Sequence, residues 1–86
     1  MDKAVLAVVR RFPHLKDEIE SLTKRNDALQ EACEDFLDAT NALDWWAATP
    51  NGAASVNRKA EYQALVEDLA REILLMLETQ GSDPIV

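Results

Sequence analysis

One hydrophobic pattern constrains the fold of this chain more than any other feature. Between Phe12 and Ala47, mainly apolar side chains recur at alternating spacings of three and four residues. This spacing places them along one side of a helix and is typical of the contact seam of a coiled coil. We call these positions the seam; they are Phe12, Leu15, Ile19, Leu22, Asn26, Leu29, Cys33, Phe36, Thr40, Leu43 and Ala47. The seam predicts a long helix that packs against a second helix.

Glycine and proline are rare and divide the sequence into three segments. The 86 residues include two glycines and three prolines. Pro13 is suited to the first position of a helix, where an N–H has no partner within the helix. The run Pro50-Asn51-Gly52 predicts a turn, and Gly81 followed by Pro84 predicts the end of a helix.

These signals predict a single all-α domain over residues 1–86. Its centre is expected to be a long antiparallel helical hairpin, similar to a coiled coil, with a short extra helix at the N-terminus. Asp2 is a candidate N-cap for the short helix, and Ser55 or Asn57 for the returning helix. The expected parts are a short helix over 2–11, a long helix over 13–48, a turn over 49–54, a returning helix over 55–80 and a tail over 81–86.

Two polar residues interrupt the seam. Asn26 places an amide and Thr40 a hydroxyl among apolar positions. An isolated polar residue in a coiled-coil seam can fix the register or the oligomeric state of the helices. Alternatively, these positions mark a solvated bend, and the sequence does not decide between the two interpretations.

The two predicted long helices differ in length, which predicts self-association. The returning helix has a wide apolar face, formed by Tyr62, Leu65, Val66, Leu69, Ile73, Met76 and Leu77. With a turn near Asn51, this face reaches back only as far as Leu22, so Phe12, Leu15 and Ile19 stay uncovered. Burial of a large apolar side chain contributes roughly 1.5 to 3 kcal/mol. We therefore expect the first helix or a second copy to cover these three residues, as in a dimeric helical bundle.

The seam and the returning helix also resemble a known family. The first half carries Phe12-Pro13-His14-Leu15, then Asp17, Ile19, Leu22, Asn26, Leu29, Cys33 and Phe36, and the second half carries Leu65, Asp68, Leu69, Glu72 and Ile73. Over residues 12–78 this pattern resembles the small YdcH-like bacterial helical-hairpin proteins. The resemblance implies a helical hairpin and implies no chemistry or site residue.

The charge of the chain is negative and unevenly distributed. The net charge is −7, and residues 26–50 contain six acidic residues and no basic residue. Such a chain repels nucleic-acid phosphates, so we expect no nucleic-acid partner and better tolerance of a basic protein. The carboxylates lie opposite the seam, where the alternative interpretation is a solvated helix face.

One arc of the long helix combines several acids with an aromatic residue, and this arc is the predicted partner surface. Its members are Asp27, Glu31, Glu34, Asp38 and Trp45. The helical wheel places Trp45 among the carboxylates and Trp46 on the flank, so Trp46 is the better candidate for the core. Exposed aromatic residues are frequent hot spots of protein interfaces. Alternatively, Trp45 packs against the loop residues Ala53, Ala54 or Val56.

An enzymatic alternative comes from the segment Glu34-Asp35-Phe36-Leu37-Asp38. It resembles the clustered helical acids of all-α metal-dependent nucleoside-triphosphate pyrophosphohydrolases, in which carboxylates can hold Mg²⁺. Those enzymes also need a Glu-x-x-Asp motif on a second helix, and Glu61, Glu67 and Glu72 are each followed at the third position by an apolar residue. We therefore expect no enzyme, with no catalytic residue, cofactor or metal.

Cysteine and histidine each occur once, as Cys33 and His14. One of each excludes an internal disulfide and a Cys/His zinc site within one chain. Cys33 is expected to be a buried structural residue, and a lone thiol suggests a reduced, cytoplasmic chain. The apolar run from Ala4 to Val9 is too short to span a membrane or to form a signal core, so we expect no membrane partner.

The sequence therefore favours a small non-enzymatic helical interaction module that acts through self-association, as a homodimer or a larger homo-oligomer, and through protein contacts. Its alternatives are the pyrophosphohydrolase and a purely structural assembly subunit whose only partner is itself.

Overall fold

The chain forms helices throughout the part that the structure describes. The computed structural model describes residues 2–48 and 52–81, apart from the side chains of 52–55, 80 and 81. Its elements are helix α1 (Lys3–Arg11), the 3-10 turn η1 (Pro13–Leu15), helix α2 (Lys16–Thr23), helix α3 (Asp27–Ala48) and helix α4 (Gly52–Gly81). The prediction of an all-α chain is confirmed.

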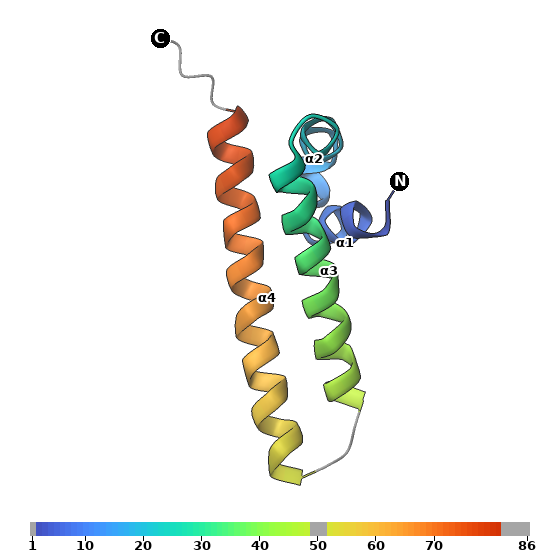
Figure 1. Ribbon diagram of the computed structural model, residues 1–86, viewed down its shortest axis with the longest axis vertical. Coiled ribbons are helices and arrows are strands. Elements are labelled where there is room, and N and C mark those ends of the chain that lie inside the picture. The colour runs from blue at the N-terminus through green and yellow to red at the C-terminus, as the bar shows by residue number, and fades with distance from the viewer. Residues whose placement is uncertain (1, 49–51, 82–86) are drawn as a thin grey trace.

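The helices form an elongated molecule with principal extents of 54 × 25 × 21 Å. α3 and α4 lie side by side along the long axis and run in opposite directions (Figure 1). α1 crosses α3, and α2 lies near the beginning of α3 (Figure 1). The short helices therefore pack near one end of the α3–α4 pair, and α3 and α4 are the only described elements at the other end.

The prediction of one long helix over 13–48 is wrong, because the helix is interrupted between α2 and α3. The side chain of Asn26 explains the break: its Oδ1 accepts a hydrogen bond from the backbone N–H of Leu29 at 3.1 Å. This is the geometry of an N-cap, which starts a new helix instead of continuing the previous one. Thr40, by contrast, donates its hydroxyl to the carbonyl of Phe36 at 2.8 Å, and α3 continues through it.

α1 begins as the sequence predicted. The Asp2 side chain accepts a hydrogen bond from the backbone N–H of Ala4 at 3.0 Å and caps the helix. The helix ends before Pro13, as expected for a residue that disfavours helical backbone in the residue before it. One side of α1 is buried, and its buried residues are Ala4, Val5, Val8 and Val9.

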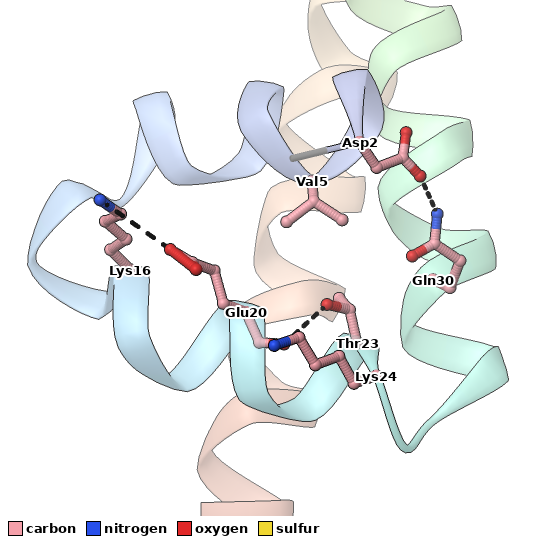
Figure 2. Close-up of a pocket in the computed structure, with 7 residues that line it drawn as sticks. All are labelled: Asp2, Val5, Lys16, Glu20, Thr23, Lys24 and Gln30. Atoms are coloured by element: carbon pink, nitrogen blue, oxygen red, sulfur yellow. Dashed lines mark hydrogen bonds and ion pairs between the residues drawn. The ribbon is translucent and has the colours of Figure 1, made fainter.

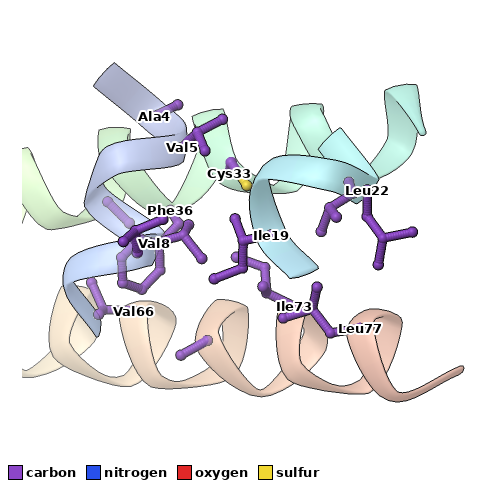
Figure 3. Close-up of a cluster of buried hydrophobic side chains, with 14 residues drawn as sticks. Ala4, Val5, Val8, Ile19, Leu22, Cys33, Phe36, Val66, Ile73 and Leu77 are labelled. Carbon is purple, nitrogen blue, oxygen red and sulfur yellow. The ribbon is translucent and has the colours of Figure 1, made fainter. Parts of the chain in front are cut away.

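The hydrophobic core lies where all four helices meet (Figure 3). Each helix contributes residues at spacings of three or four, so one side of each helix faces the others. Besides the four residues of α1, the core contains Ile19 and Leu22 from α2, Leu29, Cys33, Phe36 and Ala39 from α3, and Val66, Ala70, Ile73 and Leu77 from α4. The core therefore fixes α2 against both long helices.

The prediction that the returning helix leaves Phe12, Leu15 and Ile19 uncovered is wrong, because α2, which carries Ile19, contacts α4. Of the two covers that we expected, the first helix and a second copy, α1 contacts both α2 and η1. Ile19 is 0% exposed, and Phe12 and Leu15 are half-buried and pack against the core. The break before α3 lets α2 turn back, so that its apolar side contacts α1, α3 and α4. A single chain therefore covers the residues through which we expected self-association.

At the end of the α3–α4 pair that is far from α1, the two helices bury few apolar side chains against each other. Among the described residues, no side chain of α3 after Ala39 and none of α4 before Val66 is fully buried. Leu43, Trp46 and Tyr62 are half-buried there. This end therefore exposes apolar surface that the core does not use.

The ends of α4 differ from the predicted boundaries. α4 begins at Gly52, so residues 52–54 are helical where a turn was expected, and neither Ser55 nor Asn57 stands at its start. It ends at Gly81, one residue later than predicted. The remainder of the expected turn, residues 49–51, and the tail at 82–86 lie outside the described residues.

Candidate protein-interaction surface

The acidic stripe on α3 consists of Asp27, Glu31, Glu34 and Asp38, and all four side chains are exposed. They follow each other at spacings of four, three and four residues, which keeps them on one side of the helix. The buried residues Leu29, Cys33 and Phe36 lie on the other side. The structure thus places the predicted acids together and on the surface.

The negative charge of this stripe is not balanced by neighbouring bases. Within the described part of the chain, no ion pair involves an acid of α3. Glu34 accepts only a hydrogen bond, from the side-chain amide of Gln30 at 3.2 Å. Carboxylates three or four residues apart on a helix repel each other by roughly 0.2 to 0.5 kcal/mol per pair. A cationic partner would relieve this repulsion.

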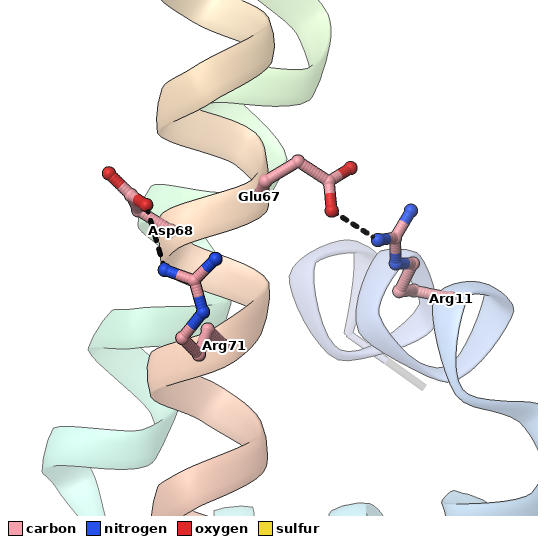
Figure 4. Close-up of polar contacts among 4 residues, drawn as sticks. All are labelled: Arg11, Glu67, Asp68 and Arg71. Carbon is pink, nitrogen blue, oxygen red and sulfur yellow. Dashed lines mark hydrogen bonds and ion pairs between the residues drawn. The ribbon is translucent and has the colours of Figure 1, made fainter.

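Two of the acids of α4 are paired with bases of the same helix. Arg58 Nη1 lies 3.2 Å from Glu61 Oε2, and Arg71 Nη1 lies 3.1 Å from Asp68 Oδ1 (Figure 4). Each of these acids therefore faces a base one turn along its own helix. The negative field of the α3–α4 pair is consequently strongest on the α3 side.

Trp45 extends the acidic stripe toward the thinly packed end of the molecule. Its side chain is 59% exposed, whereas Trp46 is half-buried. The two rings contact edge to face, with centroids 4.7 Å apart and planes at 90°. The prediction that Trp46 is the more buried of the two is confirmed. The alternative contacts of Trp45 with Ala53 and Ala54 involve side chains outside the described ones.

A groove lies beside the acidic stripe, between α3 and α4, and has a volume of about 380 Å³. Ala39 and Ala42 of α3 and an apolar row of α4 line it, with two acids of α3 on its edge. The apolar row is Tyr62, Leu65 and Leu69, and the two acids are Asp35 and Asp38. Sequence analysis missed this groove, although the excess apolar width of the returning helix was a signal for it.

A larger cavity of about 560 Å³ lies between α1, α2 and the start of α3 (Figure 2). Its lining mixes charges of both signs: Asp2, Val5, Lys16, Glu20, Thr23, Lys24 and Gln30. Lys16 Nζ lies 3.9 Å from Glu20 Oε1, and the amide of Gln30 donates to Asp2. The first contact lies within α2, and the second connects the start of α1 to α3, so we interpret the cavity as the junction of the short helices.

Cys33 is a buried thiol, as predicted. It is 0% exposed, and burial, followed by the charges of Asp2 and Glu34, raises its pKa to about 11. The thiolate, which is the reactive form, is therefore scarce at neutral pH. His14 is exposed in η1, so the two side chains lie in different environments.

The carboxylates Glu34, Asp35 and Asp38 lie on the exposed part of α3. In the described ranges 2–48 and 52–81, no group of three or more His, Cys, Asp or Glu side chains is placed to hold a metal ion. None of the helices described is both long and apolar enough to cross a membrane.

Comparisons of the chain with protein-family models, curated proteins and solved structures found no match. The resemblance to the YdcH-like helical-hairpin proteins stays a prediction. The function must therefore be inferred from the chemistry of the surface itself.

Proposed function

We propose that this chain is a non-enzymatic helical interaction module that binds a basic protein. In this proposal, α3 and α4 form the two arms of a hairpin, and the acidic stripe with Trp45 is the contact surface. One observation carries the proposal: a large aromatic side chain, 59% exposed, continues a row of four exposed carboxylates on the side of α3 opposite the core.

The two kinds of side chain have separate roles in such a contact. Charges at the rim of an interface mainly raise the association rate and make it sensitive to salt. An aromatic residue that loses water on binding mainly determines how long the complex lasts. The stripe would therefore attract the partner, and Trp45 would retain it.

Self-association is not the basis of this proposal. The burial of Ile19 removes the main apolar contact of a dimer joined through Phe12, Leu15 and Ile19. Most of the exposed large apolar side chains, namely Trp45, Val56 and Leu65, lie toward the other end of the molecule, and Leu75 is the exception. The proposed partner is a different protein that contacts the surface around Trp45.

Two variants test the roles of charge and aromatic surface. The first neutralises the stripe with Glu31→Gln, Glu34→Gln and Asp38→Asn, and the second is Trp45→Ala. We expect the neutralised variant to capture a basic partner from cell extract more slowly and with less salt sensitivity. We expect Trp45→Ala to release the partner faster, as measured by surface plasmon resonance with the recovered protein.

A matched control separates local from overall charge. Asp17→Asn, Glu72→Gln and Glu78→Gln remove the same number of charges from exposed positions outside the stripe. This control should bind normally, and no variant should melt below the wild type. If the neutralised stripe binds normally and Trp45→Ala lowers the melting temperature, Trp45 is a packing residue and the proposal is wrong.

A ligand screen separates the proposal from the pyrophosphohydrolase alternative. A ligand that binds the folded state raises the melting temperature. The enzyme would respond to Mg²⁺ with nucleoside triphosphates, whereas an interaction module should not respond.

A further inference from the structure

The groove between α3 and α4 has the form of a vacant helix position. We infer that it binds one amphipathic helix of the partner protein, with apolar side chains in the groove and lysine or arginine beside Asp35 and Asp38. This inference rests on the proposed function and names the structural class of the partner.

The spacing of the groove residues fits a helix. Asp35, Asp38 and Ala42 follow each other at three and four residues along α3, and Tyr62, Leu65 and Leu69 do the same along α4. Two such rows on neighbouring helices are the receiving surface for a third helix of a bundle. Each row extends over eight residues, or seven steps along the helix, so the guest contacts the groove over about two turns, or roughly 10 Å.

Two short side chains of α3 allow a guest helix to approach the groove closely. Ala39 and Ala42 have short side chains where they line the groove. Packed helices lie roughly 8 to 10 Å apart, and small residues permit the shorter distances. Opposite them, Leu65 is 43% exposed, and Tyr62 and Leu69 are half-buried. A guest helix would remove this apolar surface from water.

The two flanks of α3 are covered differently. α1 packs on the flank that carries Leu37, where Leu6 and Ala7 of α1 lie near Asn41. On the flank that carries Ala42, the described part of the chain provides no corresponding helix, since α1 and α2 lie elsewhere (Figure 1). The groove is thus the counterpart of a position that α1 fills on the other flank.

The negative charge around the groove favours a basic guest helix over a second copy of this chain. Asp35 and Asp38 form the α3 edge of the groove and belong to no ion pair within the described chain. Of the three bases of α4, Arg58 and Arg71 are paired with acids of their own helix, and Lys59 belongs to no ion pair among the described residues. A second copy packed groove to groove would bring a further net charge of −7 to an already acidic surface. Like charges across an interface disfavour that complex, whereas a basic helix is attracted.

These features predict which residue types the guest helix carries. Its apolar residues recur at spacings of three and four over about two turns, as in other helix-in-groove complexes. Lysine or arginine flanks them on the side that faces α3. A helix with the same apolar residues and acidic flanks should be rejected.

A constrained peptide tests this inference directly. The probe is a side-chain-stapled helix of about 14 residues, with leucines at spacings of three and four and lysines beside them, because unconstrained helices of this length are marginal in water. A second peptide replaces each lysine by glutamate. Fluorescence anisotropy should show binding of the lysine peptide and at least about tenfold weaker binding of the glutamate peptide, a difference of 1.4 kcal/mol or more.

Matched variants of the protein locate the binding site. Leu65→Gln places an amide in the groove, and Leu75→Gln makes the same change at a residue of α4 that is 55% exposed and outside it. Leu65→Gln should weaken binding of the lysine peptide at least about tenfold, and Leu75→Gln should leave it unchanged. Asp35→Asn should reduce the salt dependence of binding, whereas Asp17→Asn, at an exposed position outside the stripe and the groove, should have no effect.

Three results would overturn the inference. These are failure of the lysine peptide to bind the wild type, equal binding by Leu65→Gln and Leu75→Gln, and a wild-type dimer in sedimentation equilibrium that Leu65→Gln converts to a monomer. The last result would assign the groove to a second copy. The proposed function is judged separately, by Trp45→Ala and by the neutralised stripe, so the two can fail independently.

Discussion

Arg11 of α1 and Glu67 of α4 form an ion pair between residues 56 positions apart, with Nη2 2.6 Å from Oε1 (Figure 4). The other end of α1 is connected to α3, because the amide of Gln30 donates to the Asp2 side chain. α1 is therefore attached by polar contacts to both long helices, one at each of its ends. Its buried valines lie between these two attachments.

The Arg11–Glu67 pair should nevertheless add little to stability. The two side chains are 42% and 46% exposed, and ion pairs at such positions contribute about 0 to 1 kcal/mol. We expect Arg11→Ala and Glu67→Ala each to change the free energy of unfolding by less than about 1 kcal/mol. A double-mutant cycle in urea at low and high salt measures the coupling. A large coupling that persists in high salt would contradict this expectation.

Ile19 provides a direct test of the position of α2. Because this residue is 0% exposed, Ile19→Ala should lower the free energy of unfolding by about 2 to 5 kcal/mol. The control Leu75→Ala, at an exposed site, should change it by less than about 0.5 kcal/mol. Urea denaturation followed by circular dichroism gives both values. Equal, small effects would indicate that α2 leaves Ile19 uncovered, as a straight helix over 13–48 would.

Asn26 should contribute to stability through its cap. Asn26→Ala removes the acceptor for the N–H of Leu29 and should destabilise the protein by about 0.5 to 2 kcal/mol. Asn26→Asp and Asn26→Ser keep an acceptor oxygen and should lose less stability. The comparison uses the urea midpoints of the three variants. If Asn26→Ala were the most stable of them, the residue would be a defect in a continuous helix.

Cys33 should make stability depend on alkaline pH. Its pKa in the folded chain is raised to about 11 from an ordinary value of 9.0, so between these values the unfolded chain loses this proton and the folded chain keeps it. The unfolded state then binds fewer protons, and the free energy of unfolding falls as pH rises through this window. Well below pH 9.0 the thiol is protonated in both states and contributes no pH dependence.

Cys33→Ala isolates this effect from other groups that titrate at high pH. Urea denaturation at pH 8 and pH 10 should show a steeper loss of stability for the wild type than for the variant. The native thiol should also react slowly with a maleimide at neutral pH and rapidly in urea. Fast labelling without denaturant would show that Cys33 is accessible.

The sequence predicted which sides of the helices are buried but not how the helices are joined. Leu29, Cys33 and Phe36 were placed on the buried side because a spacing of three and four fixes a face regardless of the partner. The same spacing continues across Asn26, since α2 and α3 each direct their apolar side into one shared core. Periodicity therefore could not distinguish one long helix from two. The cap at Asn26 begins a second helix.

The interaction surface was predictable in part for a similar reason. The exposure of Glu31, Glu34 and Trp45 follows from their angle to the seam on a single helix. The groove depends on how far α4 lies from Ala39 and Ala42, and on which side of α3 is occupied by α1. Those distances arise from packing between helices, so the apolar width of the returning helix indicates spare apolar surface but not the position of the groove.

The uneven distribution of the core along the molecule has a consequence for its fluctuations. Backbone amides near Ile19, Leu29 and Ile73 lie among fully buried side chains, so their hydrogens should exchange with solvent only when the whole chain unfolds. Amides after Ala39 in α3 have few buried neighbours and should exchange through local fraying of the helix end. The end that carries Trp45 would thus open and close many times during the lifetime of the folded core. A guest helix bound there would slow that exchange, and the entropy lost in ordering this end would be part of its binding free energy.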